Sequence, residues 1–249
     1  LYRAAPANGS ATTMLNDVNA YILDLASCGR YIVAAWTFRD KSAGTNLWRL
    51  NGDGSGATQL TSGQFDHDAS CSPDGKWVYY WPNSTGGSAS RISIDGGNPE
   101  LVPGTKIKNA FGNLGRMQFT PDGKELIFGA QITDASDQRA ISKIAILSLD
   151  PPSESARLVD ADPRISGNLG FTGGLRMTRD GKAVAYAITE NGVDNIWVQP
   201  LDGSAGHQIT NFTSDHIDDF HWSPDGKTLA VERTQGADDV VLLRNSGGQ

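Results

Sequence analysis

A five-residue turn sequence recurs along this chain and constrains its fold more than any other feature. The copies are residues 72–76 (Ser-Pro-Asp-Gly-Lys), 120–124 (Thr-Pro-Asp-Gly-Lys), 178–182 (Thr-Arg-Asp-Gly-Lys) and 223–227 (Ser-Pro-Asp-Gly-Lys), with a shorter variant at 27–30. Proline presets the first corner of a type I turn, Asp bonds to neighbouring amides, and Gly takes the left-handed conformation that closes the hairpin. The motif therefore predicts hairpin turns whose aspartates are structural and not catalytic.

The turns recur at a period typical of propeller blades, which is about 40 to 50 residues. Successive spacings are 46, 48, 58 and 45 residues between Gly29, Gly75, Gly123, Gly181 and Gly226. Short apolar runs follow each turn, and with the strand before the turn they make four strands per repeat. No segment has the spacing of an amphipathic helix. We therefore expect an all-β fold, a β-propeller of four-stranded antiparallel blades in a single domain over residues 1–249.

Both ends of the chain fall inside a repeat. Residues 1–3 (Leu-Tyr-Arg) and 11–12 (Ala-Thr) match 47–49 (Leu-Trp-Arg) and 57–58 (Ala-Thr) at a constant offset of 46, so they are predicted third and fourth strands. The last apolar run, at 242–244, is again a third strand. We expect five repeats plus a partial blade, with six blades favoured and a five-bladed ring closed by the N-terminal segment as the alternative. The start at Leu1 indicates a mature piece or fragment of a longer protein.

Composition excludes some partners. The formal net charge is −7 without a cluster of Lys and Arg, so nucleic acid is not expected. No apolar run approaches the roughly 18 residues of a membrane span, and direct membrane insertion is not expected. Cys28 and Cys71 lie near corresponding places in successive repeats. A disulfide is one alternative, but its strict geometry makes two buried free thiols the favoured prediction.

Two further runs carry a resemblance to a known family. Residues 59–61 (Gln-Leu-Thr) and 208–210 (Gln-Ile-Thr), each leading to a Ser-Pro-Asp-Gly-Lys turn, resemble the WD-like propeller repeat of TolB-like proteins. The likeness covers nearly the whole chain and implies a periplasmic or other extracytoplasmic location. The same repeat builds propellers of prolyl oligopeptidase relatives, tricorn-like proteases and bacterial sensor ectodomains, so it indicates a fold better than an activity.

Ligand binding is expected where the chain enters the first strand of each blade, because these strands line the channel of a propeller. The segments are 17–21, 65–68, 109–116, 168–174 and 215–221. Counted back from the turn glycine, Asp68 and Asp219 both lie at seven, whereas His67 and His216 lie at eight and ten and are not equivalent. The candidate ligand-binding residues at this channel mouth are Asp66, His67, Asp68, Arg116, Asp215, His216, Asp218, Asp219 and His221.

An acidic mouth of this kind suits a cation, a basic peptide or a sugar. Imidazole with carboxylate suits Zn²⁺ or Mn²⁺, and carboxylates alone suit Ca²⁺, so His67, His216 and Asp218 are candidate metal ligands. The favoured alternative is that these groups hydrogen-bond between blades. Arg116 either forms an ion pair across the channel or meets a carboxylate on a ligand. No cofactor is expected, with Ca²⁺ or another divalent cation in the channel as the alternative.

Catalytic motifs are absent from the sequence. It has no Gly-x-Ser-x-Gly elbow, His-Glu-x-x-His, phosphate-binding glycine loop or Cys-x-x-Cys. The preferred hypothesis is a non-enzymatic, monomeric TolB-like propeller that binds a protein or peptide as a scaffold or extracytoplasmic sensor. Two alternatives stay open. One is a metal-dependent carbohydrate lyase or hydrolase, and the other is the gating propeller of a prolyl oligopeptidase-like protease.

Overall fold

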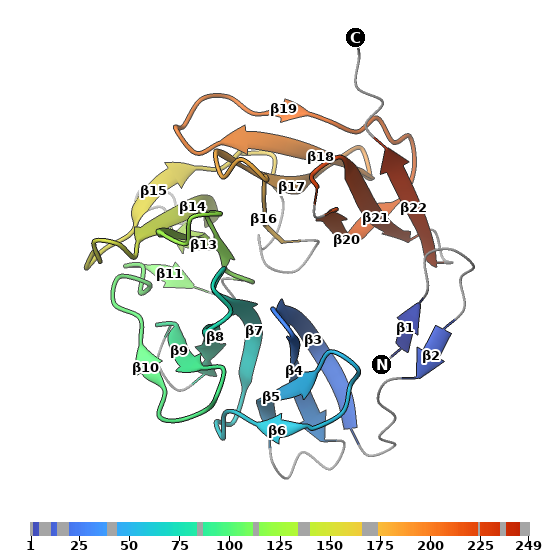
Figure 1. The fold of residues 1–249 in the computed structure, drawn as a ribbon. Coiled ribbons are helices and arrows are strands. Elements are labelled where there is room, and N and C mark those ends of the chain that lie inside the picture. The colour runs from blue at the N-terminus through green and yellow to red at the C-terminus, as the bar shows by residue number, and fades with distance from the viewer. Residues whose placement is uncertain are drawn as a thin grey trace. The chain divides into compact units, whose positions relative to one another are not determined.

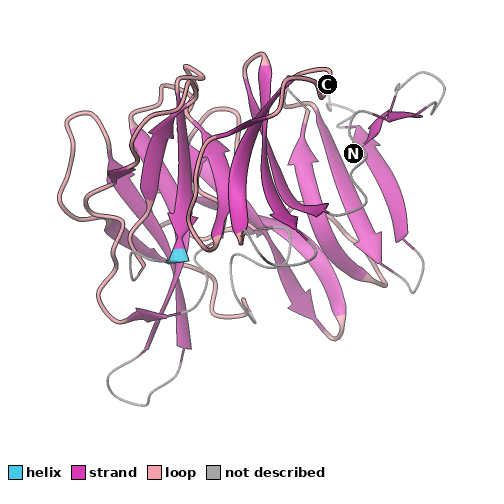
Figure 2. Cartoon of the chain, turned by 90° about the horizontal axis from the view of Figure 1, so that it is seen from below, coloured by secondary structure: helices cyan, strands magenta, loops and turns pink. Residues whose placement is uncertain are grey.

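The computed structural model describes residues 2–4, 11–13, 20–38, 44–83, 87–111, 115–133, 140–165, 174–223, 225–234 and 238–244. Strands make up nearly all of its regular structure (Figure 2), which confirms the all-β class. Within the described residues, no helix is long and apolar enough to cross a membrane. The chain divides into two compact units, Leu1–Lys106 and Ile107–Gln249, and each is described by itself.

The first unit contains two complete antiparallel sheets whose strands follow chain order. One sheet consists of β3 (Ala20–Cys28), β4 (Tyr31–Phe38), β5 (Thr45–Asn51) and β6 (Thr58–Gln59). The other consists of β7 (Asp66–Cys71), β8 (Trp77–Pro82), β9 (Ser90–Ser93) and β10 (Glu100–Leu101). Apolar side chains between the two sheets form the core of this unit, and Val33, Leu47, Val78 and Ile92 are fully buried in it.

The first unit also has a hairpin, β1 (Tyr2–Ala4) with β2 (Ala11–Thr13). It pairs Tyr2 with Thr13, and the β5–β6 pair sets Trp48 opposite Gln59. Both members of the second pair lie 46 residues after those of the first. The hairpin therefore has the register of a third and a fourth strand, as the repeat predicts.

The second unit contains three sheets (Figure 1). The first is built from β12 (Gln118–Phe119), β13 (Glu125–Thr133), β14 (Ala140–Ser148) and β15 (Arg157–Asp160), with the short β11 (Ala110–Phe111) also paired to β13. The second is β16 (Arg176–Met177), β17 (Ala183–Glu190), β18 (Val193–Pro200) and β19 (His207–Gln208). The third is β20 (His216–Trp222), β21 (Thr228–Thr234) and β22 (Asp238–Arg244).

The number of complete blades differs from the expectation. Among the described residues, four sheets have the full set of four blade strands, whereas the β20–β22 sheet has three strands and the β1–β2 hairpin has two. The expected five or six blades are therefore wrong for this part of the chain. The difference arises because the repeat pattern starts at a third strand and stops after another, so the two outermost repeats form partial sheets.

The recurring turns have nearly identical geometry. Ser72 Oγ donates to Asp74 Oδ1 at 2.6 Å, and the same oxygen accepts the Lys76 N–H at 3.1 Å. Gly75 has a φ of 70°. Equivalent bonds recur around Asp122, Asp180 and Asp225. The hydroxyl hydrogen bond and then the backbone one lower the pKa of each of these carboxyls. The bonds within each turn confirm that these aspartates are structural.

Turns of the second unit also pack against one another. A Cβ added at Gly181 would lie 2.5 Å from Pro121 Cδ, and one at Gly226 would lie 2.9 Å from Arg179 Cδ. Arg179 occupies the position that proline has in the other copies, so its methylene groups replace the proline ring under the next glycine. Each of these two glycines therefore provides space as well as a positive φ.

The Gln-x-Thr runs complete the edge of the third strand. Thr61 Oγ1 accepts the Leu47 N–H at 3.0 Å, and Thr210 Oγ1 accepts the Ile196 N–H at 2.8 Å. Gln59 Nε2 donates to the Thr61 carbonyl at 2.8 Å. Because both threonines are buried, these bonds pair amide groups that water does not reach.

Cys28 and Cys71 are joined by a disulfide with a Cα–Cα distance of 5.4 Å. The prediction of free thiols is therefore wrong. Each cysteine ends the first strand of its sheet, β3 or β7, and these two strands lie side by side in the first unit. Neighbouring strand ends thus bring the two residues within the range that a disulfide requires.

Candidate functional site

The first strands are irregular at corresponding places. The pairing of β3 with β4 skips Leu23, and that of β7 with β8 shifts between His67 and Ser70. The pairing of β20 with β21 skips Asp218. In the sheet of β13 the first strand is divided into β11 and β12, and Arg116 lies between them. Bulges redirect side chains and are common beside functional sites. We therefore take the irregular part of each first strand as the place to look for the candidate site.

In the first unit, His67 and Asp68 come together at the bulge of β7. His67 Nδ1 lies 3.1 Å from Asp68 Oδ2, and its ring centroid lies 4.6 Å from that of Phe65, which is 41% exposed. Asp68 has a φ of 55°, a left-handed conformation that non-glycine residues seldom adopt. This pair beside an exposed aromatic ring is the candidate site of the first unit.

Asp66 serves the fold at the start of the same strand. Its carboxylate is buried and accepts the Gly63 N–H at 3.0 Å. Burial raises the pKa of Asp66, and hydrogen bonds from Thr61 and Gly63 oppose the rise. The side chain therefore holds the turn that leads into β7.

Asp215 and His216, where the chain enters β20, contact side chains of the same unit and not each other. Asp215 Oδ2 accepts from Arg233 Nη2 and from Ser214 Oγ, both at 2.9 Å. His216 Nδ1 lies 3.3 Å from Asp194 Oδ1, and the buried Asp194 also accepts a backbone N–H through Oδ2. These carboxylates therefore anchor the loop that enters β20.

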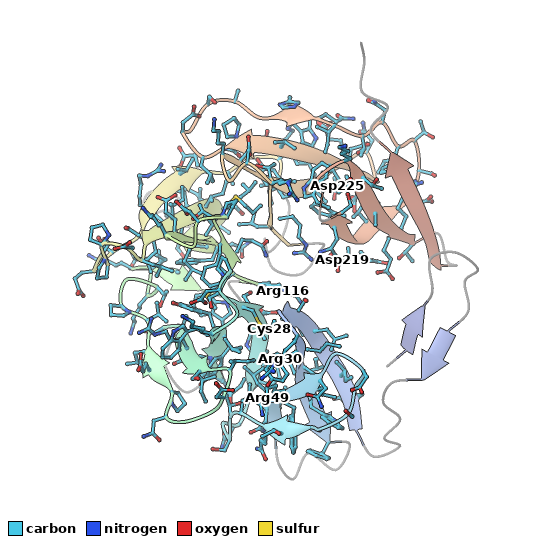
Figure 3. The ribbon with its side chains drawn as sticks, viewed as in Figure 1. Cys28, Arg30, Arg49, Arg116, Asp219 and Asp225 are labelled. Atoms are coloured by element: carbon cyan, nitrogen blue, oxygen red, sulfur yellow. A yellow bond between two sulfur atoms is a disulfide. The ribbon has the colours of Figure 1, made fainter. Side chains whose placement is uncertain are left out.

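A charged cluster forms where β16 and β20 meet. Arg176 Nη2 donates to Asp219 Oδ1 at 2.5 Å, and Arg176 Nε donates to the Phe220 carbonyl at 3.0 Å. His221 Nε2 lies 3.3 Å from Asp219 Oδ2. Arg116, which precedes β12, lies close enough for the charges of Arg176 and Asp219 to act on it, and Figure 3 labels Arg116 and Asp219. We call Arg116, Arg176, Asp219 and His221 the arginine cluster.

The charges of the arginine cluster shift the pKa values of two of its members. Burial alone would raise the pKa of Asp219, but the His221 hydrogen bond and the charge of Arg176 outweigh it and lower that pKa to about 2. Burial, followed by the like charge of Arg176, lowers the pKa of Arg116 to about 10, against the opposing effect of Asp219. The cluster therefore keeps its aspartate ionised and holds two cations together.

Sequence reasoning placed Arg116 and Asp219 among the candidates but missed Arg176. Its position, five residues before Gly181, was the available signal. The expected segment of this repeat, 168–174, ended two residues too early, and its first six residues lie outside those described. Asp218 is exposed at the bulge of β20. With Arg176 included, the site in the second unit is rich in arginine and not simply acidic.

The candidate metal ligands do not gather. Across the described ranges, no group of three or more His, Cys, Asp and Glu side chains is placed to hold a metal ion. His67 Nδ1 lies 3.1 Å from Asp68 Oδ2, and its charge also acts on Asp66. His216 Nδ1 lies 3.3 Å from Asp194 Oδ1. Among the described residues, His67, His216 and Asp218 therefore do not form one metal site.

No protein-family model and no curated protein matches this chain. Solved structures do. The protein assigned as TolB in Agrobacterium tumefaciens is 20% identical with a TM-score of 0.66, over 96% of this chain and 80% of that one. An oligogalacturonate lyase in complex with manganese is 17% identical with a TM-score of 0.66, over 98% and 69%. A nidogen/laminin complex is 13% identical with a TM-score of 0.65, over 98% and 86%. This chain therefore has a TolB-like β-propeller fold, and at these identities the likeness extends to the fold alone.

Proposed function

We propose that this chain is a non-enzymatic, extracytoplasmic propeller of WD-like repeats that binds a protein or peptide, in a single domain over residues 1–249. The observation that carries the proposal is the arginine cluster, which gathers charged side chains from three sheets of the second unit beside irregular first strands. Irregular segments on a rigid scaffold suit binding. Partner recognition is therefore assigned to this cluster.

The disulfide supports a location outside the cytoplasm. The Cys28–Cys71 bond joins two strands of the first unit, and such bonds persist mainly in oxidising compartments. The likeness to a nidogen/laminin complex supports protein binding through the shared fold only.

Peptide selection tests the proposal. A phage-displayed library of random peptides is panned on the purified chain, and selected peptides are resynthesised with a fluorophore for anisotropy titrations. We expect Asp219→Ala and Arg116→Ala each to weaken binding at least tenfold. Arg30→Ala, a change at an exposed arginine of the 27–30 turn, is the matched control and should bind like the wild type. Failure to select any peptide, or binding that neither variant weakens, would overturn the proposal.

A metal-dependent carbohydrate lyase or hydrolase is the second candidate, favoured by the likeness to an oligogalacturonate lyase in complex with manganese. It needs ligands that the described residues do not bring together. Elemental analysis after incubation with Mn²⁺, Zn²⁺ or Ca²⁺ and dialysis separates the two candidates. A stoichiometric metal that His67→Ala or His216→Ala removes would favour the lyase, whereas substoichiometric metal would favour the binding protein.

A further inference from the structure

An open cavity lies beside two of the recurring turns in the second unit. Its volume is about 500 Å³, within the range of about 300–1,000 Å³ that is typical of small-molecule sites. Residues of the 120–124 and 178–182 turns line it, together with residues at the start of β13, at the end of β14 and just after it. The cavity shares no residue with the arginine cluster, so the proposed function leaves it without a role.

Arg179 distinguishes this cavity from a simple gap between turns. The other full copies of the turn have proline at this position, and Arg179 lines the cavity. A Cβ added at Gly226 would lie 2.9 Å from Arg179 Cδ and 3.2 Å from its Cβ, so packing holds the methylene groups in place. Among the described residues, the guanidinium has no hydrogen bond or ion pair. Arg179 therefore presents its donors from an ordered side chain, which lowers the entropy lost on binding.

The turn aspartates of the cavity are already engaged. Asp122 Oδ1 accepts from the Thr120 hydroxyl at 2.6 Å and from the Lys124 N–H at 3.1 Å, and Asp180 makes the equivalent bonds within its own turn. The charge of Lys124 also acts on Asp122, and the lysine of the second turn acts on Asp180. Each of these carboxylates thus has a cation of its own turn beside it.

Two further carboxylates of the cavity are uncommitted. Glu125, the first residue of β13, and Asp150, which follows β14, line the same space as Arg179. Within the described ranges, neither side chain has a hydrogen bond or an ion pair, and no group of three or more His, Cys, Asp and Glu side chains is placed to hold a metal ion. One guanidinium and two carboxylates therefore face the cavity without partners, with a net charge of −1.

We propose that this cavity binds a basic amino acid such as lysine. The carboxylate of the ligand contacts Arg179, because the planar guanidinium matches its two oxygens. The α- and ε-ammonium groups contact Asp150 and Glu125, because an ammonium has donors only and an ionised carboxylate only acceptors. The net charge of +1 on lysine balances the uncommitted charges. This inference goes beyond the proposed function and does not depend on it.

Four small molecules test the inference on the whole chain. L-lysine is compared with three analogues that each lack one charged group: Nα-acetyllysine lacks the α-ammonium, norleucine lacks the ε-ammonium, and cadaverine lacks the carboxylate. Backbone amide resonances of Gly181 and Ser148, which line the cavity, are followed by NMR at pH 7 and low ionic strength, where exposed charges are least screened. We expect saturable shifts with lysine and at least tenfold weaker binding of each analogue.

Variants of the cavity give a second measurement. Arg179→Pro restores the proline of the other turns and should fold, but it should weaken lysine binding at least tenfold, as should Asp150→Asn. Arg179→Gln gives the same test without a change of backbone. Arg164→Gln is the matched control, since Arg164 pairs with Asp162 and Glu190 at the surface and should leave binding unchanged.

Three results would overturn the inference. They are the absence of saturable shifts with lysine, an analogue that binds as tightly as lysine, and unchanged lysine binding by folded Arg179→Pro or Arg179→Gln protein. None of them affects peptide binding at the arginine cluster, which is tested with Arg116→Ala and Asp219→Ala. Loss of peptide binding in those two variants with lysine binding intact would show that the two sites are separate.

Discussion

Arg176 donates to Asp219 across 43 positions of sequence at 2.5 Å, and the same side chain bonds the backbone carbonyl of Phe220. One residue of the short strand β16 therefore holds the first strand of the next sheet at two points. The contact fixes the part of the second unit from which the arginine cluster is built.

Arg176→Gln is expected to destabilise the protein by about 2–3 kcal/mol, because hydrogen bonds to a charged group are lost and Asp219 keeps a charge without its partner. The loss is smaller than for a fully buried pair because the Asp219 side chain is 41% exposed. Urea unfolding measures it. Arg164→Gln is the control, since Arg164 pairs with Asp162 and Glu190 at the surface and should cost no more than about 1 kcal/mol. Equal losses of unfolding free energy in the two variants would show that the Arg176–Asp219 pair stabilises the protein no more than a surface ion pair.

Asp219 should contribute to stability above pH 4 and lose that contribution towards pH 2. Its pKa is about 2 in the folded protein against an ordinary 3.8, so between these values the unfolded chain binds the proton first and unfolding is favoured as pH falls. Unfolding free energies of wild type and Asp219→Asn should therefore differ most above pH 4 and converge near pH 2. The turn aspartates titrate in both proteins and cancel in the difference. A pH-independent difference would show that Asp219 is not coupled to its cationic neighbours.

Removing the disulfide by Cys28→Ser with Cys71→Ser is expected to cost about 2–4 kcal/mol, because the bond closes a loop between residues 43 positions apart. Denaturant titrations with and without a reductant measure it. The double variant should be insensitive to reductant and should match the reduced wild type. If the reductant leaves the wild-type midpoint unchanged under conditions where thiol counting shows full reduction, the bond does not stabilise the fold.

Gly181→Ala and Gly192→Ala separate backbone conformation from space within one unit. Both glycines have positive φ, 70° and 78°, and this conformation costs other residues about 1–2 kcal/mol. A Cβ at Gly192 meets nothing within 4 Å, whereas one at Gly181 lies 2.5 Å from Pro121 Cδ. We expect Gly181→Ala to lower the free energy of unfolding by about 1–3 kcal/mol more than Gly192→Ala does, because overpacking adds to the cost of the positive φ. Similar thermal midpoints would show that the turns do not pack tightly.

The sequence predicts the strands and turns well because their determinants are local. The Ser72–Asp74–Lys76 bonds lie within five residues, and the same pattern repeats in the later turns. The register of the β1–β2 hairpin likewise follows from a constant offset between repeats. Local chemistry of this kind can be read from one repeat and applied to the next.

The cysteine pairing and the arginine cluster could not be derived in the same way. The disulfide depends on the 5.4 Å between the Cα atoms of Cys28 and Cys71, a distance that sequence spacing does not determine. The Arg176–Asp219 contact depends on which side chains neighbouring sheets place at their common edge. The hydrogen bond from the Gly63 N–H to Asp66 could not be predicted either. An aspartate that accepts a backbone hydrogen bond and one that faces a ligand are the same residue type in the sequence.

The packing of one turn on the next has a practical consequence for protein engineering. The 178–182 turn is confined on two sides, by Pro121 against Gly181 and by Gly226 against Arg179, so extra residues there have no room. Residues 202–205, between β18 and β19, are exposed and belong to the kind of loop tip that accepts insertions. An affinity tag or a fluorescent label is best placed between Ser204 and Ala205, where it leaves the stacked turns undisturbed.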